Sequence, residues 1–217
     1  MPRQNRVTPF GGLISTAARG TLMGNRGCLH DNHGAIRRSY QGTRWILCLL
    51  DFKNRRRSIM TPGQYTELFF LDEATGLAAG HRPCAECQRE RFNLFREAWA
   101  RANPALADTL QPAAPAIDAV LHQERVTTAG QKRAYLARLD DLPDHVFVAV
   151  DGDPSAYLVL KDRLLRWSPF GYEESIRRLT AAPVRALTPP SVVRALAAGY
   201  TPGLHSSAYR ALARREK

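Results

Sequence analysis

Two cysteines separated by two residues, in Pro83-Cys-Ala-Glu-Cys87, place the strongest constraint on how this chain folds. A C-x2-C pair at a tight turn directs two thiolates at one tetrahedral metal ion, typically zinc. A thioredoxin-like redox pair would follow a strand, whereas residues 72–79 have the pattern of a short helix that ends at Gly80. We therefore predict a metal site at this pair, with two further ligands from elsewhere in the chain.

The loop 27–34 offers the other ligands. It contains Cys28, His30 and His33 within six residues, and its glycines allow the tight backbone that ligand loops need. Cys48 lies in the apolar segment 44–52, which predicts a buried strand, so we interpret it first as a core thiol. The predicted zinc ligands are Cys28, His30, Cys84 and Cys87, with His33 or Cys48 as substitutes.

The segment around the pair resembles a known metal-binding domain. Residues 69–87 read Phe69-Phe-Leu-Asp-Glu-Ala-Thr-Gly-Leu-Ala-Ala-Gly-His-Arg-Pro-Cys-Ala-Glu-Cys87 and are similar to the second half of the Ada-type domain of DNA methylphosphotriester repair proteins. The chain has His81 where that family usually has tyrosine, and it lacks the family's earlier C-x3-C pair. The resemblance implies a zinc site that touches DNA, without the methyl-accepting cysteine.

Positive charge is the second informative feature. The 217 residues carry 31 Lys and Arg against 20 Asp and Glu, a formal net charge of +11. Basic surfaces attract polyanions, and the planar guanidinium of arginine suits phosphates, although GC-rich codon usage also explains many arginines. The arginines expected to contact nucleic acid, DNA before RNA, are Arg26, Arg37, Arg38, Arg55, Arg56, Arg57 and Arg82.

The leading functional hypothesis is a zinc-containing nucleic-acid-binding protein that acts on DNA in repair or processing. An alternative is a metal-assisted hydrolase of nucleic acid, such as a glycosylase, a nuclease or a deaminase-like enzyme. Zinc deaminases combine H-x-E with P-C-x-x-C, and the chain has His122 and Glu124 as candidate catalytic residues, but in inverted order. A third hypothesis is a zinc-stapled protein-interaction module.

The pattern of apolar residues predicts an α+β fold, with small antiparallel sheets and packed helices around the zinc knuckle. We expect a basic zinc-binding region at 1–103, a Pro- and Ala-rich linker at 104–116 and a second region at 117–217 with a three-stranded meander. The predicted strands are 45–52, 58–60, 65–71 and three between 145 and 167. The predicted helices are 72–79, 86–102, 117–125, 128–139 and 188–198.

Membrane insertion is not expected from the sequence. No apolar run approaches the roughly 20 residues that span a bilayer, and the N-terminus lacks the apolar stretch of a signal peptide. We therefore expect a soluble, cytoplasmic protein without a membrane partner.

Overall fold

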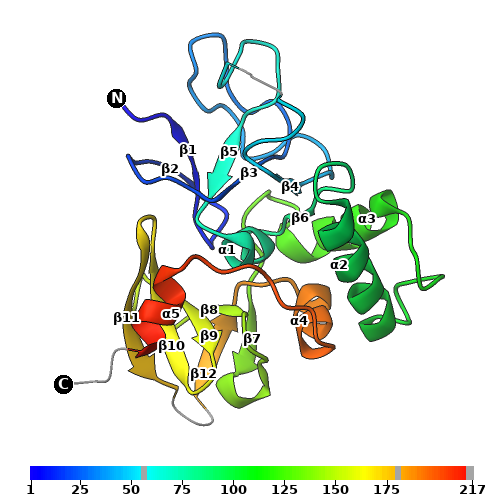
Figure 1. Ribbon diagram of the computed structural model, residues 1–217, viewed down its shortest axis with the longest axis vertical. Coiled ribbons are helices and arrows are strands. Elements are labelled where there is room, and N and C mark those ends of the chain that lie inside the picture. Colours follow the sequence, from blue (N-terminus) through cyan, green and yellow to red (C-terminus); the bar gives the residue numbers. More distant parts are fainter. Residues whose placement is uncertain (55–57, 179–181, 214–217) are drawn as a thin grey trace.

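The computed structural model describes residues 1–54, 58–178 and 182–213. It confirms the predicted α+β class, because two six-stranded sheets combine with short helices (Figure 1). The two sheets lie in opposite halves of the molecule, and helix α1 (Glu73–Ala78) lies between them. None of the helices in the described ranges combines the length and apolar composition that a membrane span requires.

The first sheet has the order β2-β1-β5-β3-β4-β6. Two of its pairs, β1 with β5 and β4 with β6, are parallel, and the others are antiparallel. Gly24 allows the close approach of two of these strands, because a Cβ there would lie 2.1 Å from the Ile46 carbonyl oxygen. The strands are β1 (Gln4–Val7), β2 (Leu13–Ser15), β3 (Leu22–Asn25), β4 (Ile46–Cys48), β5 (Leu68–Phe70) and β6 (Arg82–Pro83).

The second sheet is antiparallel throughout, in the order β11-β10-β9-β8-β12-β7. Its middle strands β8, β9 and β10 confirm the predicted meander. Every residue of β9 is buried, and alternate side chains enter different apolar clusters, because successive side chains point to opposite faces. The strands are β7 (Tyr135–Arg138), β8 (Phe147–Ala149), β9 (Ala156–Leu160), β10 (Arg163–Ser168), β11 (Gly171–Arg177) and β12 (Pro183–Ala186).

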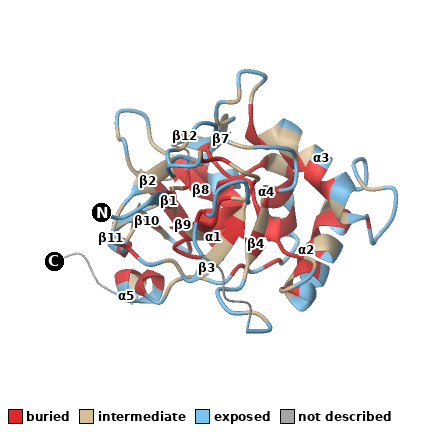
Figure 2. Cartoon of the chain, turned by 90° about the horizontal axis from the view of Figure 1, so that it is seen from above, coloured by how far each residue is buried: buried red, intermediate tan, exposed pale blue. Residues whose placement is uncertain are grey.

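Helices α2, α3 and α4 pack on one side of the second sheet, and α5 packs on β11 (Figure 1). The aromatic stripe of Phe92, Phe95 and Trp99 on α2 is core, together with apolar residues of α3 and α4. Figure 2 shows buried segments on each of these helices. Residues 103–113 connect α2 to α3, and both helices belong to the same apolar cluster. The helices are α2 (Arg89–Ala102), α3 (Ala114–Arg125), α4 (Pro190–Ala197) and α5 (Ser207–Ala213).

Two neighbouring acidic residues tie helix α1 to the second half of the chain. Asp72 caps the helix by accepting a hydrogen bond from the Thr75 N–H at 2.9 Å. Its other oxygen accepts from the Tyr172 hydroxyl at 2.9 Å and from the His205 N–H at 3.0 Å. Glu73 likewise accepts from the Gly203 N–H at 2.8 Å. The acidic start of α1 is therefore a buried junction between the two halves.

Two local predictions are wrong. Residues 128–139 form a turn followed by β7, not a helix, because Gly130 has a φ of +74° and β7 pairs along its whole length with β12. Residues 58–60 form a turn rather than a strand, and Met60 has a φ of +59°. In both segments a turn residue with positive φ breaks the predicted element.

Candidate metal centre

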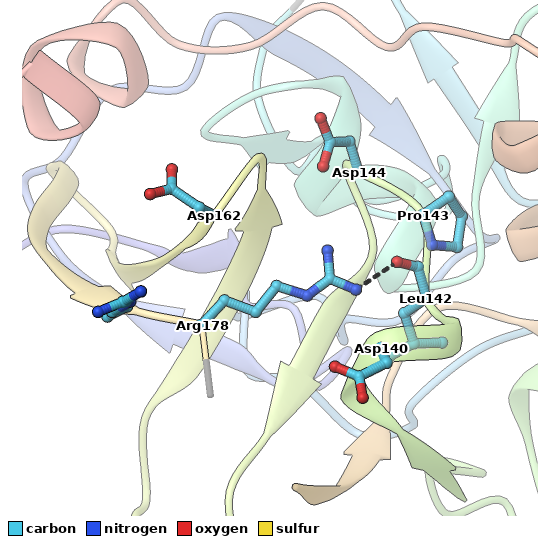
Figure 3. A pocket seen from close by; sticks show the side chains of 7 residues that line it. Asp140, Leu142, Pro143, Asp144, Asp162 and Arg178 are labelled. Atoms are coloured by element: carbon cyan, nitrogen blue, oxygen red, sulfur yellow. Dashed lines mark hydrogen bonds between the residues drawn. The ribbon is translucent and has the colours of Figure 1, made fainter. Parts of the chain in front are cut away.

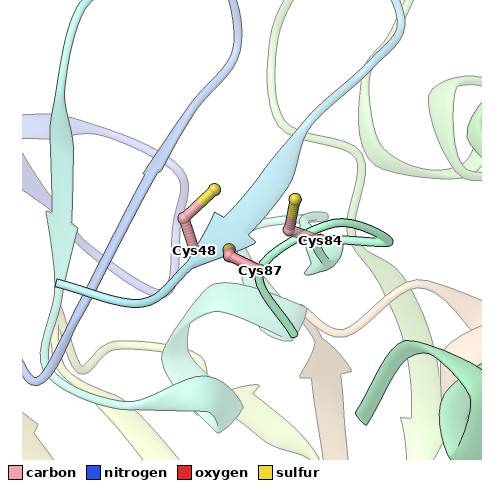
Figure 4. Close-up of side chains that lie close together, drawn as sticks. All are labelled: Cys48, Cys84 and Cys87. Carbon is pink, nitrogen blue, oxygen red and sulfur yellow. The ribbon is translucent and has the colours of Figure 1, made fainter. Parts of the chain in front are cut away.

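Three cysteines come together at the edge of the first sheet (Figure 4). The sulfur atoms of Cys48, Cys84 and Cys87 all lie within 4.8 Å of one another. Cys48 ends strand β4, Cys84 follows strand β6, and Cys87 lies in the turn that leads to α2. The third cysteine therefore comes from a strand that lies outside the C-x2-C knuckle.

Backbone pairing brings the strand and the knuckle into contact. Strands β4 and β6 run parallel with Leu47 opposite Pro83, so the next residues, Cys48 and Cys84, lie beside each other. The Cys84 N–H donates a hydrogen bond to the Leu47 carbonyl at 2.8 Å. The Gln88 side-chain amide donates to the same carbonyl at 2.9 Å, which fixes the turn after Cys87 against the strand.

The knuckle has the tight turn that two ligands to one metal require. The Gln88 N–H donates to the Cys84 carbonyl at 3.1 Å, which closes a single helical turn around the pair. The Glu86 N–H points at the Cys84 sulfur, 3.4 Å away, and favours its thiolate form. The Cys48 and Cys87 thiols also donate hydrogen bonds to Cys84, and they lower the pKa of that thiol.

The three sulfur atoms could hold a metal ion. Tetrahedral zinc with thiolate bonds of about 2.3 Å places its sulfur ligands about 3.8 Å apart, a separation that falls within the observed limit. Among the described residues, no further His, Cys, Asp or Glu ligand atom belongs to this cluster. The arrangement thus provides three soft ligand atoms for one metal ion.

The predicted ligand set is corrected in two positions. Cys84 and Cys87 lie together as predicted, their partner is Cys48, which was predicted only as a substitute, and neither Cys28 nor His30 belongs to the cluster. The His30 ring is buried against Thr66, with Nδ1 2.6 Å from the hydroxyl oxygen. Its Nε2 lies 3.2 Å from the Thr61 carbonyl. His30 is therefore held by these hydrogen bonds, as a core histidine.

The other two candidates of that loop also lie outside the cluster. Cys28 is half-buried, and its sulfur lies 3.7 Å from the His30 carbonyl oxygen. His33 is exposed, and its N–H donates to Asp31 at 2.9 Å as part of a loop turn. The sequence predicted ligands in this loop because its cysteine and two histidines lie close together in the chain. The parallel pairing of β4 with β6, which selects Cys48, has no local sequence signal.

The cysteine cluster lies in the wall of a large cavity. The cavity has a volume of about 1370 Å³, and strands β3, β4, β5 and β6 and the loop before β4 contribute to its lining. Aromatic and apolar side chains, amide groups and charged groups all contribute to the lining. The lining includes Phe52, Tyr65, Phe69, Ile59, Asn25, Gln41, Arg44 and Glu67. A metal held by the three cysteines would therefore face a space large enough for a small molecule.

A buried ion pair supports the side of the cavity next to Cys84. Arg82 donates to both oxygens of Asp118, at 2.9 and 2.7 Å, and the two side chains are only 3% and 4% exposed. This bidentate geometry fixes α3 against β6. Arg82 is consequently not part of an exposed basic surface, which corrects one predicted nucleic-acid contact.

The remaining predicted nucleic-acid contacts divide into three groups. Arg26 is 2% exposed, so it too is absent from the surface. Arg37 and Arg38 are exposed, and Arg37 forms an ion pair with Asp31 at 2.7 Å. Arg55, Arg56 and Arg57 lie outside the described residues. Arg44, which the sequence analysis did not select, is exposed and lines the cavity.

The predicted catalytic pair, His122 and Glu124, is not brought to one site. Both are on α3, where residues two apart do not face each other. Glu124 accepts hydrogen bonds from the Ser191 N–H at 3.1 Å and from the Ser191 hydroxyl at 2.6 Å, at the start of α4. The His122 ring instead lies against Tyr40, with the ring centroids 5.1 Å apart. Glu124 therefore acts as a helix cap from a neighbouring element.

A second, smaller cavity of about 510 Å³ lies beside the second sheet (Figure 3). Asp140, Asp144 and Asp162 surround Arg178, which donates to the Leu142 carbonyl at 2.7 Å. That contact ties the end of β11 to the short helix at Leu139–Asp141. The role of Arg178 here is structural.

No protein-family model, curated protein or solved structure matches this chain. The resemblance of residues 69–87 to an Ada-type domain thus stays a prediction.

Proposed function

We propose that this protein is a zinc-dependent hydrolase that acts on nucleic acid, with Cys48, Cys84 and Cys87 as the zinc ligands. The observation that carries the proposal is the position of three converging thiols in the wall of a cavity of about 1370 Å³. Structural zinc sites are closed by four protein ligands, whereas catalytic sites have three and keep one position open.

The donor set favours zinc over harder cations. Thiolate ligands select zinc, copper(I) or iron–sulfur clusters, whereas magnesium and calcium take oxygen ligands. Zinc with three protein ligands lowers the pKa of a water in the fourth position and makes it a nucleophile near neutral pH. The geometry of this chain thus matches the three-cysteine version of a hydrolytic centre.

Glu67 is the cavity carboxylate that we assign to proton transfer. It is 3% exposed, it lines the same cavity as the cysteines, and one of its oxygens accepts the Met60 N–H at 2.7 Å. That hydrogen bond fixes the orientation of the carboxylate. Asp118 and Glu86 also line the cavity, but both oxygens of Asp118 are bound to Arg82, and Glu86 is exposed. Glu67 therefore replaces Glu124 in the hydrolase hypothesis.

The lining of the cavity supports a nucleobase or nucleotide as the reacting group. Phe52, Tyr65 and Phe69 offer aromatic surface on which a base can stack, and Asn25 and Gln41 offer amide groups that can pair with its edge. Arg44 supplies an exposed cation at the same cavity. The net charge of +11 favours a polyanionic substrate, for which single-stranded DNA is the first choice.

A protein-interaction module is the second candidate function. Leu49 and Leu50 directly follow Cys48, line the cavity and are 39% and 53% exposed. Exposed leucines beside a metal centre also suit a docked protein chain. In that case the metal would act as a staple, and the cavity would take a side chain of the partner.

The proposal is tested with zinc-loaded protein and single-stranded oligonucleotides that contain all four bases. Fluorescence anisotropy measures binding, and mass spectrometry detects deamination, base release or strand cleavage. We expect binding that weakens steeply with salt and a product that Glu67→Gln protein does not form. Arg44→Ala should weaken binding several-fold, whereas Arg177→Ala, an exposed arginine on the second sheet, should not.

Two results would contradict this function. Absence of binding at low salt would exclude the nucleic-acid substrate. Normal binding without any product from the zinc-loaded protein would exclude the hydrolase and favour a binding role.

A further inference from the structure

Three basic side chains surround the indole ring of Trp45 inside the protein, and a fourth, Lys132, lies close enough for Arg125 and Arg26 to lower its pKa. The guanidinium carbons of Arg26 and Arg125 lie 4.7 and 4.1 Å from the centre of that ring. The His81 ring lies 5.1 Å from it. Arg26 is 2% exposed, and His81 and Arg125 are completely buried. We call Arg26, His81, Arg125 and Lys132 the basic cluster.

The members of the basic cluster come from four separate parts of the chain. Arg26 follows β3, His81 precedes β6, and Arg125 ends α3. Lys132 lies in the loop before β7, and its side chain reaches inward so that the ammonium group donates to the Ala78 carbonyl. Four elements thus deliver positive charge to one interior position, which local sequence bias alone does not explain.

Acidic compensation of this charge is incomplete within the described ranges, because Asp118 raises the pKa of Arg125 without forming an ion pair with it. None of the ion pairs among the described residues includes Arg26, Arg125 or Lys132. Asp118 has both oxygens on Arg82. Buried charges are normally paired, because an isolated ion loses its hydration without compensation.

Backbone carbonyls satisfy only some of the donors. Arg26 donates to the Gly11 carbonyl at 2.9 Å, and Arg125 donates to the Gly80 carbonyl at 2.8 Å and to the Thr43 carbonyl. The Nε atoms of both arginines and both ring nitrogens of His81 are buried without a hydrogen-bond partner. Since buried polar groups are nearly always paired, these orphaned atoms indicate that a further group belongs here.

The electrostatics of the basic cluster agree with a missing anion. Burial, with further repulsion from Arg125 and Arg26, lowers the pKa of Lys132 to about 7. Burial also lowers the pKa of Arg125 to about 9 and that of Arg26 to about 10. An anion between these groups would raise these three pKa values, because it stabilises the charged forms of the side chains.

We propose that Arg26, His81, Arg125 and Lys132 form a binding site for a phosphate group. Two planar guanidinium groups and one ammonium group match the charge and the several acceptor oxygens of a phosphate dianion. The burial of the site excludes the backbone of a nucleic-acid polymer and selects free phosphate or the phosphate of a mononucleotide. This site is separate from the cysteine cluster, so it does not depend on the proposed hydrolase activity.

The test compares the thermal unfolding of the full chain in phosphate and in chloride at matched ionic strength. We expect inorganic phosphate at a hundredfold excess over its Kd to raise the Tm by about 5 °C or more. Lys132→Met should abolish this increase. Lys161→Met, an exposed lysine in the turn between β9 and β10, should retain it.

Adenosine 5′-monophosphate identifies the source of the phosphate. A response to inorganic phosphate assigns the site to the free ion, and a response to the nucleotide alone assigns it to a mononucleotide. An equal Tm of the wild-type protein in phosphate, nucleotide and chloride would overturn the proposal. So would an unchanged response in Lys132→Met. If that variant does not fold, calorimetric titration of the wild-type protein decides, and no binding of either ligand overturns the site.

Discussion

The N–H of Cys84 donates a hydrogen bond to the carbonyl of Leu47 at 2.8 Å, and this contact positions the candidate metal centre. It extends the parallel pairing of β4 with β6 by one residue, so that Cys48 reaches the C-x2-C knuckle. The third cysteine of the cluster is therefore positioned by a contact between residues that are far apart in the chain. The cysteine cluster thus depends on the strand pairing of the first sheet.

Replacement of Cys48 distinguishes the ligand set proposed from the structure from the one that the sequence predicted. Cys48→Ser should weaken zinc binding by more than about 100-fold, because it removes one of three thiolates. Cys28→Ser is the matched control, because Cys28 lines the same cavity outside the cluster. Competition with a chromophoric chelator measures both affinities. Equal loss in the two variants would show that Cys28 is also a ligand.

The ion pair between Arg82 and Asp118 should contribute strongly to the stability of the folded chain. Asp118→Asn leaves the Arg82 guanidinium buried without a counter-charge, at a cost of about 3–5 kcal/mol in the free energy of unfolding. Urea unfolding measures this change. Asp151→Asn, which removes an exposed partner of Arg185, should leave the free energy unchanged within error. Similar effects of the two variants would contradict the buried role of Asp118.

Glu124 should prove structural rather than catalytic. Glu124→Ala removes the acceptor for the Ser191 N–H and hydroxyl at the start of α4, and should cost about 0.5–2 kcal/mol of stability. Glu97→Ala, an exposed position on α2, serves as the control and should cost less. Chemical denaturation followed by circular dichroism measures both. A Glu124→Ala protein of wild-type stability would show that the cap does not hold α4.

The basic cluster predicts an unusual dependence of stability on pH in buffer without phosphate. The folded state lowers the pKa of Lys132 to about 7, whereas the unfolded chain keeps it near 10.5. Between these values the unfolded state binds more protons, so the free energy of unfolding rises with pH. The wild-type protein should gain up to about 1.4 kcal/mol per pH unit relative to Lys132→Met, measured by urea unfolding from pH 7 to 9. Parallel pH profiles would contradict the burial of the ammonium group.

The sequence predicted the parts of the fold that depend on local patterns. Alternating and continuous apolar runs identified the meander of β8, β9 and β10, and the spacing of Phe92, Phe95 and Trp99 identified α2. The helix predicted at 128–139 is wrong, because pairing of this segment with β12, which lies far away in the sequence, overrides its local helical preference. Local patterns do not encode such distant partners.

The candidate site was predicted only where its residues are neighbours in the chain. Spacing alone identified Cys84 and Cys87, whereas the third cysteine follows from the register of two parallel strands. Composition gives the number of arginines but not which of them are buried. Arg26 and Arg82 were therefore expected at the surface, whereas both are buried. Burial of a cation depends on which partners the tertiary structure supplies.

X-ray absorption spectroscopy at the zinc edge of the zinc-loaded protein tests the central claim most directly. We predict three sulfur ligands at about 2.3 Å and one oxygen or nitrogen ligand at about 2.0 Å, which is an open site in the wall of the cavity. Four sulfur ligands would show a closed structural site, and failure to bind zinc in a folded protein would show that the three cysteines are not a metal centre. Either result would contradict the proposed hydrolase.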